Sequence, residues 1–190
     1  MDYFTADLHF GHENAVRFDH RPFSNAEDMF IQMRSLWNEK ISDNDDVWIL
    51  GDVTCGKKPD VMRYVSALNG RKHLIYGNHD RNIITSPELQ GLFVECCHLR
   101  FLQSEGRVLF LSHYPIADWY GMNHGSFHIY GHIHKKTDDV FRFMTAGQRG
   151  QHAFNAGCMI NGYVPVTFDE LVENNLIFRE QNTYEKEEIQ

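Results

Sequence analysis

The sequence predicts an α/β fold built from two packed, mixed β-sheets flanked by helices. Short apolar segments alternate with amphipathic ones through the first half of the chain, which is typical of parallel strands joined by helices. From about residue 92 onward the pattern becomes strand, turn and strand, so the second half is expected to be rich in β-structure. The chain has 190 residues, 42% of them hydrophobic, which is enough for one well-filled core. We therefore predict a single domain over residues 1–178, followed by a polar tail over residues 179–190.

The elements of the first half are placed by their start and stop signals. Residues 1–6, MDYFTA, indicate a first strand. Ser24 and Glu27 form a capping-box pattern, which predicts a helix over about residues 25–40. The apolar run VWIL at residues 47–50 then predicts a short buried strand.

A second helix and four further strands follow in order. The segment 59–70 predicts a helix with Pro59 near its start and an Asn-Gly pair as its stop. KHLIY, at residues 72–76, predicts the next strand. Glu105 and Gly106 indicate a hairpin turn between two strands, and FHIY at residues 127–130 predicts another strand.

Charge and cysteine content limit the functional classes. A formal net charge of −8 argues against a broad basic face for extended nucleic acid, so a small or locally gripped substrate fits better. The four cysteines form no C-x-x-C pair, which argues against a zinc ribbon or a secreted disulfide framework. No secretory signal and no apolar run of membrane-spanning length are present, so we expect a cytoplasmic protein without membrane contact.

His132 and His134 stand two residues apart, directly after an apolar run. On a strand they would reach the same site, as metal ligands do, whereas in a surface loop they would be ordinary polar residues. His124, His128 and His132 also have helical spacing, so a helix with a histidine stripe is a third interpretation. Gly131 and the β-favouring residues before it favour the strand.

Each apolar strand is followed by a compact polar cluster. The clusters read DLHFGH, GD, GNHD, SHYP and GHIH in chain order. Because the carboxyl ends of neighbouring strands converge, we expect these side chains to share one site.

These motifs resemble those of the calcineurin-like metallophosphoesterases, in the order D-x-H, G-D, G-N-H-[DE], a later histidine and G-H-x-H. The resemblance extends from residue 4 to about residue 157, where a late NAG ends. It implies a four-layer αββα sandwich and a pair of divalent metal ions. The metal ligands it implies are Asp7, His9 and His134 for one ion, Asn78, His113 and His132 for the other, and Asp52 between them.

The ligand types agree with this resemblance. Carboxylate, imidazole and amide oxygen ligands suit Mn, Fe, Zn or Ni, and we take Mn as the first choice. Two divalent ions carry four positive charges, against the two negative charges of Asp7 and Asp52. The remaining charge would bind phosphate and generate a metal-bridging hydroxide that attacks phosphorus. The predicted function is a binuclear metal-dependent phosphoesterase that favours phosphodiesters, with a phosphomonoesterase or a nuclease of the same family as alternatives.

Other residues near the motifs are candidates for catalysis or substrate binding. The resemblance makes His79 a general acid or a charge stabiliser, with Asp80 as its orienting partner, whereas a buried histidine holding the loop is the alternative. The candidates for gripping phosphate oxygens are His12, Arg17, Arg21 and Arg81.

Aromatic residues and one cysteine also distinguish this chain. Tyr114 and Trp119 would stack on a substrate ring, or else cover the core. Cys55 stands where many relatives carry a second acidic residue.

Two alternatives come from other functional classes. GDVTCGKK, residues 51–58, is close to the P-loop pattern, but Lys58 replaces the Ser or Thr that binds magnesium. A non-catalytic metal-binding module would use the same ligands. The ligands would neutralise only part of the charge of the metal pair, and His79 would lie beside it. Both features favour an enzyme over a non-catalytic module.

Overall fold

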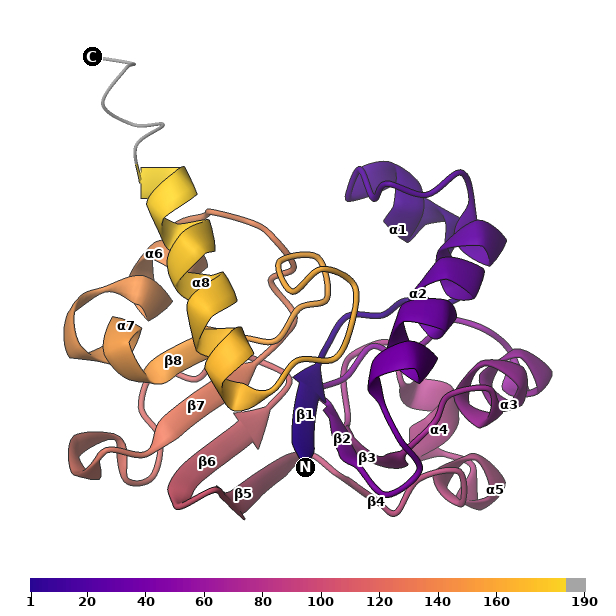
Figure 1. Ribbon diagram of the computed structural model, residues 1–190, viewed down its shortest axis with the longest axis horizontal. Coiled ribbons are helices and arrows are strands. Elements are labelled where there is room, and N and C mark those ends of the chain that lie inside the picture. Colours follow the sequence, from indigo (N-terminus) through magenta and orange to yellow (C-terminus); the bar gives the residue numbers. More distant parts are fainter. Residues whose placement is uncertain (184–190) are drawn as a thin grey trace.

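The first of two four-stranded sheets is formed entirely by the first half of the chain. We describe a computed structural model of residues 1–183 (Figure 1). All strand pairs of this sheet are parallel, as predicted. In spatial order the strands are β1 (Asp2–Thr5), β2 (Asp46–Ile49), β3 (Arg71–Ile75) and β4 (Glu95–Cys97).

Five helices connect the strands of this sheet. They are α1 (Glu13–Phe18), α2 (Ala26–Lys40), α3 (Lys58–Ser66), α4 (Arg81–Ile84) and α5 (Pro87–Gln90). The predicted capping box of α2 is wrong by one residue. Asn25 is the N-cap and accepts a hydrogen bond from the backbone N–H of Asp28 at 2.8 Å. Glu27 instead forms an ion pair with Arg63, because it lies on the exposed side of the helix.

The second sheet is mixed. Its strands, in spatial order, are β5 (Leu99–Ser104), β6 (Arg107–Ser112), β7 (Phe127–Tyr130) and β8 (Ala153–Asn155). The predicted hairpin joins β5 to β6, and Glu105 and Gly106 both adopt left-handed conformations, with φ of 49° and 78°. The pairs β6–β7 and β7–β8 are parallel. Because His128 lies within β7, the histidine-striped helix is excluded. The strand ends at Tyr130, however, so His132 and His134 lie in the loop that follows it and not on the strand as predicted.

Several helices of the second half were not predicted from the sequence. They are the short 3-10 helix η1 (Met122–His124) and the α-helices α6 (Asp139–Thr145), α7 (Gly147–His152) and α8 (Phe168–Thr183). The predicted polar tail begins inside α8, where Arg179 donates a hydrogen bond to the backbone oxygen of Ala153 at 2.5 Å. Residues 184–190 of that tail lie outside the described part of the chain.

The core forms three layers between the helices and the two sheets. On β2, Val47 and Ile49 face a cluster shared with α2 and α3, whereas Trp48 faces the second sheet. Leu109 of β6 meets Trp48 in this central cluster. The outer face of the second sheet packs against α6 through residues such as Met144. Figure 1 shows α1–α5 on the side of the first sheet and α6–α8 on the side of the second. This arrangement confirms the predicted fold class of two packed sheets flanked by helices.

All four cysteines are free thiols. Within residues 1–183, no helix combines the length and the apolar character needed to cross a bilayer.

Candidate metal centre

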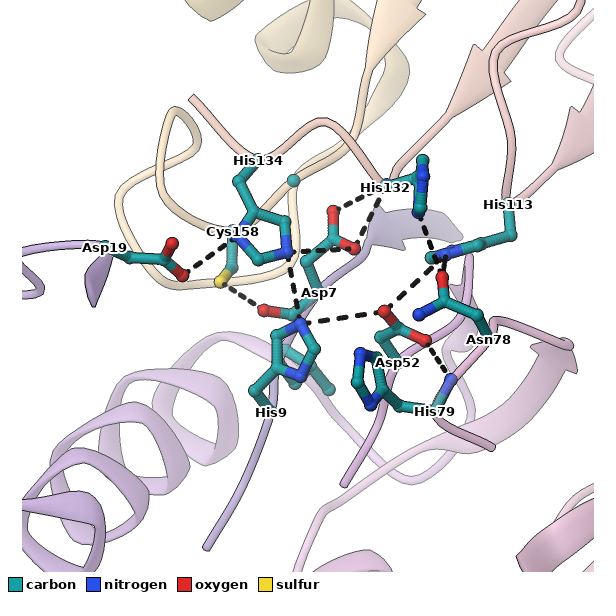
Figure 2. A network of polar contacts seen from close by, with 12 residues as sticks. Asp7, His9, Asp19, Asp52, Asn78, His79, His113, His132, His134 and Cys158 are labelled. Carbon is teal, nitrogen blue, oxygen red and sulfur yellow. Dashed lines mark hydrogen bonds and ion pairs between the residues drawn. The ribbon is translucent and has the colours of Figure 1, made fainter. Parts of the chain in front are cut away.

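The polar clusters that follow the strands meet at one place, between the carboxyl ends of both sheets (Figure 2). The loops after β1, β2 and β3 bring residues of the first sheet, and the loops after β6 and β7 bring histidines of the second. The predicted metal ligands that meet here are Asp7, His9, Asp52, Asn78, His113, His132 and His134.

Most of these ligands have unusual backbone conformations. The non-glycine ligands with positive φ are Asp7 (57°), His9 (52°), Asp52 (56°), His132 (71°) and His134 (51°). Such conformations are strained for residues with a Cβ, and they concentrate at functional sites. Here they turn the chain sharply after β1, β2 and β7, so that the side chains face the same space.

Two glycines leave room for the ligands. A Cβ on Gly77 would lie 2.3 Å from Oδ1 of Asp52, and a Cβ on Gly51 would lie 2.4 Å from Nδ1 of His113. Both approaches are closer than van der Waals contact permits. The glycines of the GD and GNHD motifs are therefore required by the close approach of neighbouring loops.

The first ligand group contains Asp7, His9, Asp52 and His134, with one ligand atom of each within 4.8 Å of the others. Nε2 of His9 lies 3.1 Å from Nε2 of His134 and 3.6 Å from Oδ2 of Asp52. Nε2 of His134 lies 3.8 Å from Oδ1 of Asp7. This spacing is what ligands around one transition-metal ion require.

The second group contains Asp52, His113 and His132. Oδ1 of Asn78 lies 3.0 Å from Nε2 of His113 and 2.9 Å from Nδ1 of His132. Oδ2 of Asp52 is 3.6 Å from Nε2 of His113, the same distance as to His9 in the first group. Asp52 thus belongs to both groups.

Burial shows that these residues fit a cation. Asp7 is fully buried, and burial raises the pKa of its carboxyl to about 6. Burial, and then the neighbouring His134, lower the pKa of His9 to about 2, so this imidazole is neutral and able to coordinate. Nδ1 of His9 is buried and has no hydrogen-bond partner among the described residues. Neutral imidazoles and carboxylates facing one another are a donor set for divalent ions.

Contacts behind the predicted ligands hold them in place, and no motif indicated the most important of these contacts. Nδ1 of His134 donates to Oδ2 of Asp19 at 2.9 Å. Burial by itself would raise the pKa of the Asp19 carboxyl. The hydrogen bond with His134 and the nearby Arg21 outweigh burial and lower this pKa to about 2. Asp19 lies outside every motif. Nδ1 of His113 donates to the backbone oxygen of Leu50 at 2.8 Å, which leaves Nε2 for a metal.

The structure corrects the role predicted for Arg21. Its side chain is buried under the site, and it donates hydrogen bonds to the backbone oxygens of Leu8 at 2.9 Å and Asp7 at 3.0 Å. Arg21 also pairs with Asp19. It therefore supports the Asp7 loop and does not reach a substrate.

The role predicted for Asp80 is also wrong. Its buried carboxylate accepts backbone N–H groups from Gly77 and Asp52 at 2.8 Å and from Val53 at 3.0 Å. These bonds tie the loop after β3 to the loop after β2. The ring of His79 instead contacts Cys55, with Nδ1 of His79 lying 3.3 Å from Sγ.

The centre opens into a cavity of about 230 Å³. His12 and His79 line it, whereas Arg17 and Arg81 are not among its lining residues. His79 is exposed, so the alternative of a buried histidine does not hold. The described residues that line the cavity beyond the metal ligands and these two histidines are Asn14, Ala15, Phe18, Asp19 and Lys136.

The two aromatic candidates differ in their surroundings. Tyr114 is 48% exposed, and its ring packs edge-on against the ring of His132 at 4.7 Å between centroids. Trp119 is buried and donates its indole N–H to Ser126, so it covers the core.

The P-loop alternative finds no support at residues 51–58. A P-loop presents free backbone N–H groups to phosphate, but those of Asp52 and Val53 donate to Asp80. The N–H of Gly56 donates to Oγ1 of Thr54 at 2.9 Å, and Lys58 pairs with Glu88.

Comparisons with known proteins cover nearly the whole chain. Residues 3–185 match the sequence model of the calcineurin-like phosphoesterases. An uncharacterized protein of Methanocaldococcus jannaschii is 29% identical over 185 residues, which span 95% of this chain and 96% of that protein. The gene 66 protein of Mycobacterium phage D29 is 28% identical over 159 residues, 70% of this chain and 78% of that one. A solved structure of a protein of unknown function from Aquifex aeolicus has a TM-score of 0.69 at 25% identity, and covers 91% of this chain and 98% of its own.

Proposed function

Because the chain belongs to the calcineurin-like phosphoesterase family, as its motifs predicted, we propose that it hydrolyses phosphodiesters at a centre of two divalent metal ions. The observation that carries this proposal is the position of Asp52. Its Oδ2 lies 3.6 Å from the nearest nitrogen of both His9 and His113, one from each ligand group. A carboxylate shared by two ligand groups suits a bridging ligand.

The ligands leave the proposed centre positively charged. When bound, two divalent ions supply Lewis acidity and lower the pKa of a water molecule. Asp7 and Asp52 are the ionisable acids among the ligands, and they offset only part of the four positive charges. A phosphate group can therefore bind at the mouth of the cavity.

His79 is the proposed general acid. Its backbone N–H donates to Oδ1 of Asp52 at 2.8 Å, which fixes its main chain against the bridging carboxylate. Nδ1 faces Cys55, so Nε2 is the nitrogen available to protonate a leaving oxygen in the cavity.

The cations at the cavity favour a diester over a monoester. A dianionic monoester needs additional fixed donors, such as bidentate arginines. Arg21 is buried. Among the described residues that line the cavity, Lys136 is the one lysine, and no arginine is present. A monoanionic diester matches this smaller charge.

Exposed rings beside the cavity favour a substrate with a planar group. Phe18, at the cavity rim, is 72% exposed, and Tyr114 lies on the side of His132. Rings in such positions can stack on a nucleobase or an aryl group. We therefore propose a small phosphate ester or a nucleotide as substrate.

Metal analysis and a matched pair of substrates test this proposal. After reconstitution with Mn²⁺, the first choice of metal, we expect two ions per chain. Asp52→Asn should weaken the binding of both ions, and His134→Ala should weaken mainly one. With the preferred metal, bis(p-nitrophenyl) phosphate should show a higher kcat/KM than p-nitrophenyl phosphate. One ion or fewer per chain would refute the binuclear centre, and the opposite substrate order would refute the diester preference.

A further inference from the structure

We infer that Cys55, His12 and His79 form a third metal site, beside the proposed pair, that takes a thiophilic divalent ion such as Zn²⁺. The ion inhibits the protein because it binds Nδ1 of His79 and so prevents the ring from becoming the imidazolium that donates a proton from Nε2. The inhibition rests on the proposed function, in which His79 acts on the substrate. The binding of the ion does not rest on it.

The first support is the spacing of the ligand atoms. Sγ of Cys55 lies 3.3 Å from Nδ1 of His79 and 3.5 Å from Nδ1 of His12. Around a tetrahedral Zn²⁺, with Zn–S about 2.3 Å and Zn–N about 2.0 Å, sulfur and nitrogen ligands stand about 3.5 Å apart. Each nitrogen therefore lies at the distance from the sulfur that two ligands of one ion show.

The second support is His9, at the inner side of the same cluster. One ligand atom each of His9, His12 and Cys55 lie within 4.8 Å of one another. The ring of His9 is 5.7 Å from that of His12 and 5.1 Å from that of His79, and the latter two are 6.1 Å apart. Imidazoles sharing a tetrahedral zinc have ring centroids roughly 5 Å apart. His9 also has a buried Nδ1 with no hydrogen-bond partner among the described residues, while its Nε2 faces the proposed pair.

Metal binding would use the atoms of this cluster differently from hydrogen bonding. Without a metal, the thiol can donate to one Nδ1 while its sulfur weakly accepts the N–H of the other ring. A metal ion accepts electron pairs from the sulfur and both nitrogens at once. On binding, the S–H bond breaks, an S–metal bond forms and the proton leaves to solvent.

The ligand type gives the site its selectivity. A thiolate ligand favours Zn²⁺ over Mn²⁺, whereas carboxylate ligands favour harder ions. Cys55 is exposed, so an ion can reach it without unfolding.

Cobalt spectroscopy tests the site independently of catalysis. Protein reconstituted with Co²⁺ should show a thiolate-to-cobalt charge-transfer band in the near ultraviolet. Cys55→Ser should abolish this band and bind one Zn²⁺ fewer per chain, and His12→Ala should weaken it. Cys97→Ser, a matched change of a partly buried cysteine in β4, should retain the band. A wild-type protein without the band, or a band that persists in Cys55→Ser, would overturn the site.

Zinc inhibition tests the consequence. With Mn²⁺-loaded proteins, each normalised to its own zinc-free rate, Cys55→Ser should need roughly tenfold more Zn²⁺ for half-inhibition than wild type or Cys97→Ser. Equal sensitivity would show that zinc acts by displacing manganese from the pair, and would overturn the inhibitory role. If the protein had no phosphoesterase activity, the proposed function would fail, and the cobalt band would still decide whether the third site exists.

Discussion

Asp80 offers a sharp test of how the centre is held together. Its carboxylate is fully buried and accepts three backbone N–H groups, two of them on one oxygen and the third, from Val53, on the other. In Asp80→Asn, an amide oxygen can keep the first two bonds, but the amide NH₂ must then face the N–H of Val53. A buried donor left without an acceptor costs about 1–3 kcal/mol, and a hydrogen bond to a charged group contributes about 1.5–3 kcal/mol.

Removing a buried charge offsets part of this loss, since burial raises the pKa of Asp80. We expect the free energy of unfolding to fall by about 2–3 kcal/mol. This is the loss of the charged hydrogen bond from Val53 plus the cost of a buried donor without an acceptor, less the gain from no longer burying a charge. The assay is urea unfolding at neutral pH in the presence of a chelator, so that metal binding does not contribute.

Asp138→Asn is the matched control. Asp138 also accepts two backbone N–H groups, from Val140 and Phe141, but it is an exposed N-cap at which Asn serves equally well. Its unfolding free energy should change by less than about 0.5 kcal/mol. If the two substitutions gave the same change, the role of Asp80 in joining the two loops would be refuted.

Three further predictions concern single residues. With metal occupancy confirmed, His79→Ala should lower kcat about a hundredfold or more on an alkyl or nucleoside leaving group and far less on nitrophenolate, which departs unprotonated; equal losses would exclude general acid catalysis. Gly77→Ala should lower metal affinity by about 10- to 100-fold in a metal titration, because its Cβ would displace Asp52, whereas Gly91→Ala should not. Burial lowers the pKa of His128 to about 4 in the folded protein, below its value in the unfolded chain. Between these two pKa values the unfolded state binds more protons than the folded state. Folding stability is therefore lost as the pH falls from about 6.5 to 4. Between pH 7 and pH 5, wild type should lose about 2 kcal/mol more than His128→Asn in urea unfolding, and equal losses would contradict this assignment.

The sequence alone was sufficient for the location and most of the membership of the candidate centre. Parallel strands bring their carboxyl ends to one edge, so residues directly after apolar runs must lie near one another whatever the details of packing. This is why Asp7, Asp52 and His132, far apart in the chain, were correctly expected in one site. The same periodicity predicted two sheets flanked by helices.

The tertiary structure decided which polar side chains point into the cavity and which point into the protein interior. Arg21 lies near a motif and Asp80 within one, yet both side chains turn inward to satisfy backbone groups, and a linear pattern cannot show that direction. Asp19 was missed for the complementary reason, because its contact with His134 spans 115 residues and leaves no local signal. Cys55 was visible in the sequence only as a departure from a motif, and its proximity to two imidazoles is set by the loops that cross there. Local pattern fixes where a strand ends, whereas side-chain direction in the turn that follows depends on contacts made by distant parts of the chain.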